Sequence, residues 1–333
     1  MKMPLRISMR TLLSLLTLLV LLFGASPVRA QITCSSTSMS ALSFGSVNPL
    51  ASQTDFTATL NYTCKNSGNK TYSALLCFSI GEPGGGQTNP RLMNNGTNKL
   101  QFQMYQDANR STVWGSQYFG SFLTPLQVSI TLAKNTSTSG SATLYGQVSG
   151  GQISAIPGSY TDVYMNGDTA LTINDVQSGT PPTNCDWSQT GNSFPFTVSA
   201  TVTKQCLVTA VSDVDLGSVP ASATNIANNG SIAITCSNTT PYYVGLRPSN
   251  NSSTGAGVMS AAAGNTDQVP YQLYQDAAMT NIWGNTATMS SAGNSVAGSG
   301  SGTAKSHTVY VRAPSADYRA DSYSDTVTVN VNY

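Results

Sequence analysis

The chain contains the same sequence pattern twice, and this repeat constrains its fold more than any other feature. Residues 101–107 read QFQMYQD and are followed by VWG at 113–115, while residues 271–276 read YQLYQD and are followed by IWG at 282–284. The Tyr-Gln-Asp and Trp-Gly pairs share one offset of 169 residues. Shorter matches flank them, at 42–47 and 215–219, at 143–148 and 308–313, and at 159–162 and 322–325. The repeat predicts two copies of one domain.

Within each copy, apolar and polar residues alternate with a period of two. Near the end of the chain Val327, Val329, Val331 and Tyr333 alternate with Thr and Asn residues. Gly, Pro, Asn and Ser interrupt such runs roughly every ten residues, and no segment keeps a helical period. The pattern predicts an all-β protein with two immunoglobulin-like β-sandwich domains in tandem.

The N-terminus has the order of a secretory signal peptide. Three basic residues precede an apolar run at 12–23. The small-residue motif Val28-Arg29-Ala30 follows a few residues later. We therefore expect a signal peptide at 1–30, with cleavage after Ala30 and export of the rest of the chain. Cleavage leaves 11 of the 15 Lys and Arg residues against 14 Asp and Glu. This slightly acidic balance gives no indication of nucleic acid as a partner.

Six cysteines follow the predicted cleavage site, and an even count in an exported chain indicates disulfides. Cys34 and Cys64 are 30 residues apart, and so are Cys206 and Cys236. The equal spacing predicts the bonds Cys34–Cys64 and Cys206–Cys236, and elimination then leaves Cys77–Cys185. A metal site is the competing interpretation, but the chain has one histidine, His307, and no C-x-x-C pair.

The residues that catalysis needs do not occur in a recognisable arrangement. His307 lies between Ser306 and Thr308 on an expected strand, and there is no G-x-S-x-G or H-E-x-x-H motif. A glycosidase using Glu82 or a pair of aspartates is a less favoured alternative. We predict that the protein is not an enzyme and uses no metal or cofactor.

The repeated features resemble the spore coat protein U domain family, found in secreted pilins of archaic chaperone–usher pili. The resemblance rests on the cysteine pair, the Leu-x-Phe-Gly element, the Tyr-x-Asp and Trp-Gly block, and the closing run of alternating Val residues up to Tyr333. It implies that each pilin domain lacks its last strand, which the next subunit donates from its N-terminus. It also implies a periplasmic chaperone, an outer-membrane usher and a neighbouring pilin as partners, with transport through the periplasm to the cell surface.

One segment has the character of a closing strand supplied by the same chain. Ahead of Cys206, at about 193–203, alternating inward positions are occupied by Phe194, Phe196, Val198, Ala200 and Val202. We predict that this segment completes an N-terminal domain at 31–203. The C-terminal domain at 204–333 ends after its penultimate strand and is expected to need a donor.

These expectations together predict where this subunit stands in the pilus fibre. After cleavage only Gln31, Ile32 and Thr33 precede Cys34, which is too short a segment to donate. A subunit that accepts a strand and donates none stands at the pilus tip, so we predict a tip adhesin that attaches to abiotic or host surfaces and supports biofilm formation. The alternative is a non-adhesive coat or pilus-cap protein.

Two apolar loops and an insertion are the candidate surface-binding regions. The first loop holds Val47, Pro49 and Leu50; the second holds Tyr118, Phe119 and Phe122; the insertion at 164–190 holds Trp187. Exposed apolar loops bind apolar surfaces through dehydration. The alternative for Phe122 is that it begins the next strand and faces the core.

The remaining repeated residues favour structural roles. Tyr105, Trp114, Tyr274 and Trp283 could stack on sugars, but their presence in both copies favours core packing. Asp162 and Asp325 also recur, and we interpret each as a structural polar group rather than half of a catalytic pair.

Overall fold

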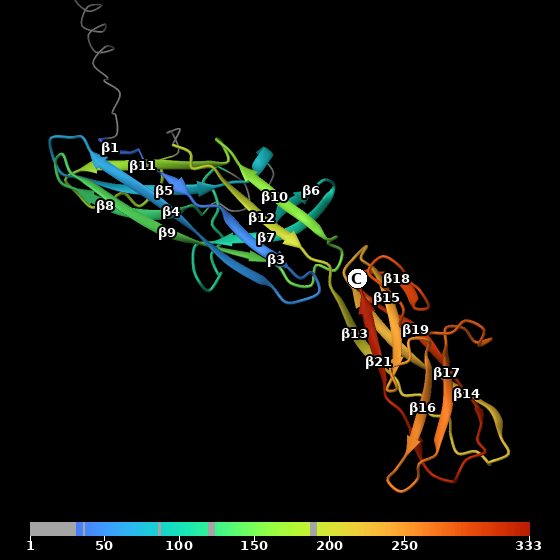
Figure 1. Cartoon of the computed structure of the whole chain (residues 1–333). Coiled ribbons are helices and arrows are strands. Elements are labelled where there is room, and N and C mark those ends of the chain that lie inside the picture. Colours follow the sequence, from blue (N-terminus) through green and yellow to red (C-terminus); the bar gives the residue numbers. More distant parts are fainter. Residues whose placement is uncertain (1–30, 36, 86–87, 119–123, 187–191) are drawn as a thin grey trace, which may run out of the picture.

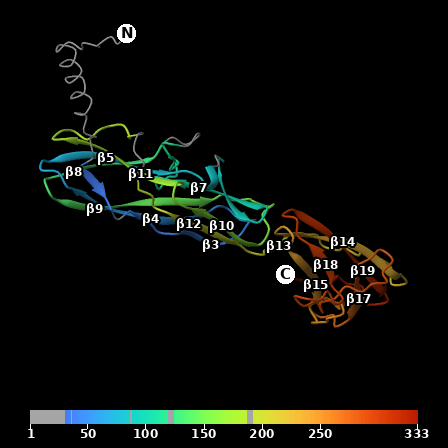
Figure 2. The ribbon, with the colours of Figure 1, turned by 90° about the horizontal axis from the view of Figure 1, so that it is seen from above.

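The computed structural model describes residues 31–333 except 36, 86–87, 119–123 and 187–191. The predicted signal peptide at 1–30, with Phe119, Phe122 and Trp187, lies outside the described residues. In the described part the chain is all-β, with one short 3₁₀ turn, η1 (Pro83–Gly85). Two β-sandwich bodies lie end to end (Figures 1 and 2). None of the described helical structure is long and apolar enough to span a bilayer.

The first body, which we call the N-terminal domain, is built from two sheets. The larger has nine strands in the order β1-β4-β9-β7-β6-β10-β12-β3, with β2 paired to β4. Its strands are β1 (Ile32–Cys34), β2 (Ser38–Met39), β3 (Leu42–Val47), β4 (Thr54–Asn66), β6 (Arg91–Asn95), β7 (Asn98–Tyr105), β9 (Ser137–Val148), β10 (Gly158–Tyr164) and β12 (Phe196–Val202). The smaller has the order β11-β5-β8, with β5 (Tyr72–Ile80), β8 (Leu126–Leu132) and β11 (Thr169–Gln177).

The second body, the C-terminal domain, repeats this plan with fewer strands. One sheet has the order β13-β14-β19-β17-β16-β20, and the other has the order β18-β15-β21. The strands are β13 (Cys206–Val211), β14 (Thr224–Cys236), β15 (Pro241–Pro248), β16 (Ala256–Ala261), β17 (Gln268–Tyr274), β18 (Val296–Ser299), β19 (Ala304–Ser315), β20 (Tyr323–Ser324) and β21 (Val327–Asn332).

The strands form because their inward positions are apolar at every second residue. In β4 the side chains of Ala58, Leu60, Tyr62 and Cys64 are buried, while the residues between them are mostly exposed. Strand β5 differs, since nearly all of its residues are buried. Its outward side chains Leu75 and Cys77 pack against Cys185, so that strand is covered on both faces.

Each domain has its own core. The first cluster of buried apolar side chains draws only on residues between Ile32 and Val202. The second draws on residues from Ile232 to Ala313, with partly buried neighbours as late as Val331. Trp114 and Trp283 are fully buried, one in each core, and donate through their indole nitrogens to Phe78 O at 2.8 Å and Val244 O at 2.7 Å. These aromatic positions therefore pack the core.

A short segment joins the two domains, because only residues 203–205 separate β12 from β13. Thr203 N donates to Val47 O at 3.0 Å, and Gln205 N donates to Ser237 Oγ at 3.0 Å. Asn238 Nδ2 also donates across the junction to Ser154 O at 2.9 Å. The linker is thus hydrogen-bonded to both domains.

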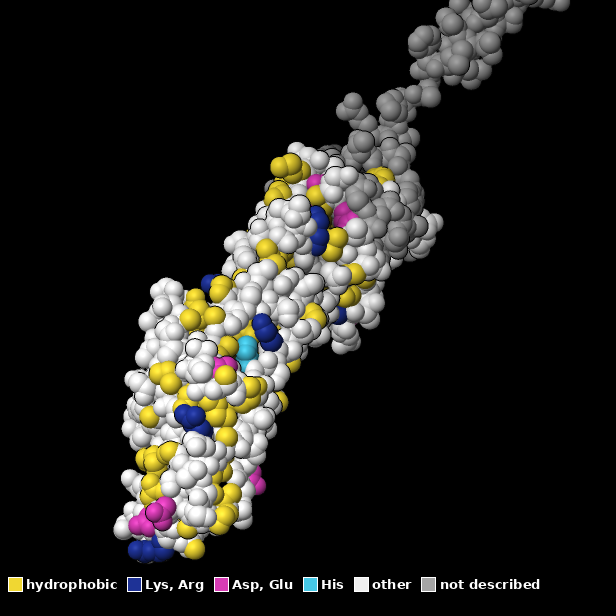
Figure 3. All heavy atoms as spheres, turned by 90° about the vertical axis from the view of Figure 1, so that its right-hand side faces the viewer, with side chains coloured by type: hydrophobic (Ala, Val, Ile, Leu, Met, Phe, Trp, Pro, Cys, Tyr) yellow, Lys and Arg dark blue, Asp and Glu magenta, His cyan; other side chains and the backbone are white. Residues whose placement is uncertain are grey.

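The surface is largely uncharged. Figure 3 shows one face on which hydrophobic and charged side chains are scattered among polar groups and backbone. Lys, Arg, Asp and Glu make up 9% of the whole sequence. Among the described residues one salt bridge occurs, between Arg110 and Asp55.

Candidate functional site

The strand β12 fills the space between β10 and β3 in the N-terminal domain. It pairs antiparallel with β10 along seven residues, from Gly158↔Val202 to Tyr164↔Phe196, and parallel with β3, beginning at Val198↔Leu42. The five residues predicted for the closing strand are all buried: Phe194 0%, Phe196 6%, Val198 0%, Ala200 4% and Val202 2% exposed. Phe194 precedes the strand itself, and its N–H donates to Thr169 Oγ1 at 2.9 Å.

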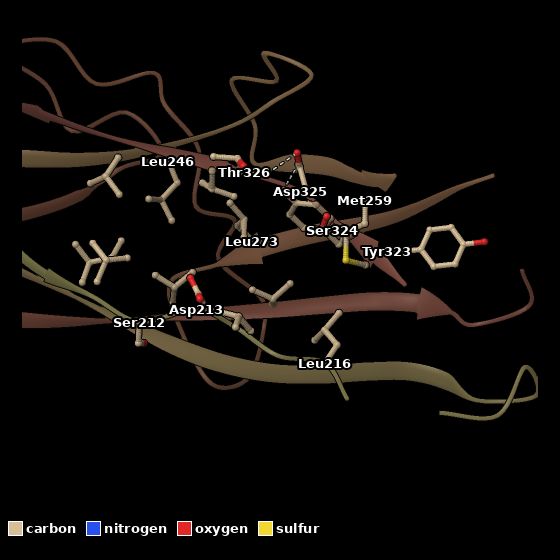
Figure 4. A pocket seen from close by; sticks show the side chains of 18 residues that line it. Ser212, Asp213, Leu216, Leu246, Met259, Leu273, Tyr323, Ser324, Asp325 and Thr326 are labelled. Atoms are coloured by element: carbon tan, nitrogen blue, oxygen red, sulfur yellow. Dashed lines mark hydrogen bonds between the residues drawn. The ribbon is translucent and has the colours of Figure 1, made fainter. Parts of the chain in front are cut away.

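The C-terminal domain has a groove at the corresponding place. Its first part has a volume of about 480 Å³ and lies between residues 211–216 on one wall and 323–329 on the other. Figure 4 shows Ser212, Asp213 and Leu216 on one wall, facing Asp325 and Thr326. A second part of about 540 Å³ continues along residues 214–221 and 318–323. The floor of the groove is apolar and includes Leu246, Leu273 and Val311.

A comparison within the molecule shows how the two regions correspond. Val214, Leu216 and Gly217 stand where the first domain has Leu42, Phe44 and Gly45. Both glycines have left-handed backbones, with φ of 63° at Gly45 and 76° at Gly217. A residue with a side chain rarely adopts this conformation, so glycine at both positions preserves the same bend. The segment 213–217 of the second domain therefore shares the glycine bend of β3.

The paired and unpaired edges differ in burial and hydrogen bonding. Leu42 and Phe44 are 0% and 4% exposed, and they belong to the strand β3, which pairs with β12. Val214 and Leu216 are half-buried, and residues 213–220 form no strand. An unpaired apolar edge of this kind favours the addition of another strand.

One polar pair at the groove joins Tyr271 to Asp325. The Tyr271 hydroxyl donates to Asp325 Oδ2 at 2.6 Å. Burial, together with this bond to the carboxylate, raises the pKa of the Tyr271 phenol. The phenol therefore stays protonated and holds the Asp325 carboxylate at the groove.

The first-domain counterpart of Asp325 is Asp162, which lies in the filled region and is 7% exposed. Burial and the nearby Glu82 charge raise the pKa of Asp162 from 3.8 to about 6, against the opposing effect of Arg91. Arg91 is also buried and donates to Trp114 O at 2.9 Å and Ile80 O at 3.0 Å. These groups sit within a packed region, which fits a structural role.

The three disulfides have the pairings expected from the sequence: Cys34–Cys64, Cys77–Cys185 and Cys206–Cys236. Cys34 ends the pairing of β1 with β4, opposite Cys64, and Cys206 begins the pairing of β13 with β14, opposite Cys236. Cys77–Cys185 ties the segment that follows β11 to β5, the middle strand of the smaller sheet.

The first candidate surface loop does not present an apolar surface. Val47 is 3% exposed, Pro49 is buried and Leu50 is half-buried. Val47 pairs with Val202, and its carbonyl accepts a hydrogen bond from Thr203, so the loop lies at the junction between the domains. Val47 is buried there because it pairs with Val202 at the end of β12.

The second loop and the insertion come together. Tyr118 is 39% exposed, and Gln117 Nε2 donates to Asp186 O at 3.1 Å. Gln117 lies beside the Ile80 end of β5, where its N–H donates to Ser79 Oγ at 3.3 Å. The insertion also reaches the other end of β5, where Gln177 pairs with Tyr72 and Ser178 N donates to Thr71 O at 3.0 Å. The end remote from the junction also holds the loops at 67–71 and 133–136, which the repeat pattern did not single out.

The one histidine of the chain, His307, packs inside the C-terminal domain. His307 is buried, its Nε2 lies 2.9 Å from the Tyr242 hydroxyl, and burial lowers its pKa. Within the described ranges no three His, Cys, Asp or Glu residues cluster as metal ligands.

The family model of the Spore Coat Protein U domain matches residues 20–165 and 192–330. A search of curated protein sequences finds no match. A chain of the CsuC–CsuE chaperone–tip adhesion subunit pre-assembly complex, from archaic chaperone–usher Csu pili of Acinetobacter baumannii, is similar in structure. It is 17% identical with a TM-score of 0.51, covering 90% of this chain and 100% of that one. The CupB6 tip adhesin of Pseudomonas aeruginosa is 11% identical with a TM-score of 0.35, covering 91% and 94%.

Proposed function

The chain belongs to the Spore Coat Protein U domain family, and on this premise we propose that it is the tip subunit of a surface pilus. In this proposal the C-terminal domain accepts a strand from the neighbouring pilin. The N-terminal domain attaches to an abiotic or host surface and so supports biofilm formation. A periplasmic chaperone and an outer-membrane usher assist assembly.

The observation that carries the proposal is the contrast between the two domains. In the first, β12 lies between β10 and β3 and buries four of its side chains among the core. In the second, the corresponding walls border a groove with an apolar floor in its first part and a more polar lining in its second part. Each buried apolar side chain of an added strand stabilises the complex by about 1.5–3 kcal/mol before the costs of ordering are counted. Several such residues are enough to drive assembly.

The connection between the domains supports the same conclusion. β12 closes the first domain and continues after residues 203–205 into β13, the first strand of the second. The second domain thus supplies its own N-terminal extension to the first. In the proposed fibre, one subunit completes the fold of the neighbouring subunit with its N-terminal segment. Here the segment ahead of the second domain completes the fold of the first domain within one chain.

The start of the described chain is engaged in its own domain. Gln31 N and Ile32 N both donate to Asp175 Oδ2, at 2.5 and 2.8 Å. Ile32 is fully buried, and β1 pairs with β4. Residues from Gln31 onward are therefore committed to the N-terminal fold, which favours a subunit that accepts a strand.

Attachment is proposed for the end of the N-terminal domain remote from the junction. The exposed residues there include Asn69, Lys70, Lys134 and Asn135. They are polar or basic, which favours contact with a hydrated or negatively charged surface over a strongly apolar one.

The test is a titration of the purified chain with peptides copied from N-terminal extensions of candidate partner pilins, followed by thermal unfolding. We expect a cognate peptide to raise the melting temperature of the C-terminal domain and to leave that of the N-terminal domain unchanged. If no peptide binds and both domains melt as complete folds, the proposal fails.

A second assay separates adhesion from capping. The peptide-bound chain is applied to glass, polystyrene and anionic lipid-coated beads, and retention is measured. Retention that is lost when Lys70 and Lys134 are both changed to Glu supports adhesion through the remote end. Peptide binding without retention on any surface favours the alternative, a non-adhesive cap or coat protein.

A further inference from the structure

The wall of the groove at 213–217 differs in charge from the corresponding edge of the first domain, and this difference indicates the chemistry of the partner. We propose that the strand accepted by the C-terminal domain carries basic side chains at two outward-facing positions, where Asp213 and Asp215 select it. The inference rests on the proposed function and specifies which donor the groove prefers.

The first domain provides the register for the argument. β12 alternates between buried residues and the more exposed Thr197, Ser199 and Thr201. Ser199 pairs with Ser43 of β3 on one side and with Thr161 of β10 on the other. Thr197 precedes Val198, which pairs with Leu42, the first residue of β3. Continuing this register by one residue brings Thr197 to the position of Ala41. The outward side chains of the closing strand thus have uncharged neighbours on the β3 side.

The second domain has acidic residues at these places. Aligning Gly217 with Gly45 puts Asp213 at the position of Ala41 and Asp215 at the position of Ser43. Both aspartates are exposed, whereas Val214 and Leu216 between and beyond them are half-buried. The alternation matches that of β3, so the carboxylates flank the outward side of any strand that lies in the groove.

The opposite wall does not offset this charge. Ser324 and Thr326, which stand where the first domain has Thr161 and Val163, are exposed and uncharged. Asp325 points inward and accepts the Tyr271 hydrogen bond. Ser324 and Thr326 therefore add no positive charge beside the donor. Arg319 lines the second part of the groove, where Asp321 lies with it.

The two carboxylates have no basic partner in the part of the chain that the structure describes. Asp215 Oδ1 accepts a hydrogen bond from Gly217 N at 2.8 Å, which fixes the carboxylate at the edge. The one salt bridge there joins Arg110 and Asp55 in the other domain. Neighbouring strands lie roughly 4.8 Å apart, so Lys or Arg at the two outward donor positions would reach these carboxylates.

The difference in charge also distinguishes the two strands that the chain binds, its own β12 and the donor strand of the neighbouring pilin. β12, with Thr197 and Ser199, matches the uncharged wall at Ala41 and Ser43. A basic donor matches Asp213 and Asp215, while an acidic one meets like charges. Charge at the rim contributes to the choice of partner and to the rate of encounter, in addition to apolar burial.

The experiment uses the full purified chain and three peptides built on the alternating pattern of β12. One has Thr and Ser at the two outward positions, one has Lys at both, and one has Glu at both. Affinity is measured by fluorescence anisotropy at low and high ionic strength. The expected order is Lys tightest and Glu weakest, with the Lys peptide about fivefold tighter than the neutral one at low salt and the difference reduced at high salt.

A matched variant tests the residues themselves. Asp213→Asn together with Asp215→Asn keeps the side-chain shape and an acceptor for Gly217 N. The variant is expected to bind all three peptides with similar affinity.

Equal affinities in the unmodified chain would overturn the charge inference while leaving the proposed function intact. Failure of every peptide, including pilin-derived ones, would overturn the proposed function itself. Self-association of the chain that a groove-binding peptide displaces would identify a second copy of the chain as the occupant of the groove and overturn the inference.

Discussion

Phe196 in β12 stacks on Tyr164 in β10, with ring centroids 4.6 Å apart and ring planes 10° apart. The two residues are 32 positions apart in sequence, and both are buried. The contact packs the first residue of β12 against the last residue of β10. It therefore gives a direct way to test how much β12 contributes to the first domain.

We expect Phe196→Ala to destabilise the N-terminal domain by about 3–5 kcal/mol, because a buried aromatic ring is replaced by a cavity. The C-terminal domain, which has a separate core, should be unaffected. Denaturant unfolding monitored separately for each domain measures both. Thr197→Ala, at an outward position of the same strand, is the control and should change stability by less than about 0.5 kcal/mol. Equal effects of the two variants would show that β12 does not close the fold.

The two left-handed glycines should respond differently to substitution. Gly45→Ala is expected to destabilise the N-terminal domain by about 1–2 kcal/mol, since φ is 63° and β3 is held by β12. An added Cβ would meet nothing within 4 Å at either glycine, so the cost is conformational. Gly217→Ala should affect the folded C-terminal domain less and weaken donor-peptide binding more, because residues 213–220 are not yet paired. Peptide affinity and domain stability, measured on both variants, check this expectation. A larger loss of stability for Gly217→Ala than for Gly45→Ala would contradict it.

Asp162 makes the stability of the first domain depend on pH. Its pKa is about 6 in the folded domain and 3.8 ordinarily. Between these values the folded state holds a proton that the unfolded chain has released, so stability decreases as pH rises through this window. The full difference corresponds to at most about 3 kcal/mol.

Asp162→Asn should remove this dependence and raise the stability of the N-terminal domain at pH 7.5 relative to the unmodified chain. Thermal unfolding at pH 4.5 and 7.5 compares the two proteins. A pH response that is unchanged in the variant would assign the effect to other groups.

The disulfides should act on separate domains and by different amounts. Cys77–Cys185 closes a loop with a sequence separation of 108, and Cys206–Cys236 closes one of 30. The chain-entropy argument gives about 5 kcal/mol for the longer loop and about 4 kcal/mol for the shorter one. The variant Cys77→Ala with Cys185→Ala should lower the melting temperature of the N-terminal domain only, and Cys206→Ala with Cys236→Ala that of the C-terminal domain only. Loss of both transitions in either variant would indicate that the domains fold as one unit.

Much of the architecture could be predicted from the sequence, because it is encoded locally. The period-two alternation in residues such as Val327, Val329 and Val331 specifies strands, and the repeat with its offset of 169 specifies two related domains. The alternating residues from Phe194 to Val202 identified a segment that the structure places between β10 and β3. These inferences needed only the order of apolar and polar residues along the chain.

The position of the loops, and the chemistry of the groove, depended on the tertiary structure. Sequence alone cannot show that Val47 meets Thr203, since 156 residues separate them and only strand order brings them together. The same holds for Asp213, which follows β13, and Asp325, which lies between β20 and β21, since only the fold brings these two segments to one groove. The sequence by itself determined the strands, the two domains and the cysteine pairs, since each follows from spacing within the chain. The tertiary structure decided which edges are filled, which are open and which loops reach the free end, because those depend on contacts between residues distant in sequence.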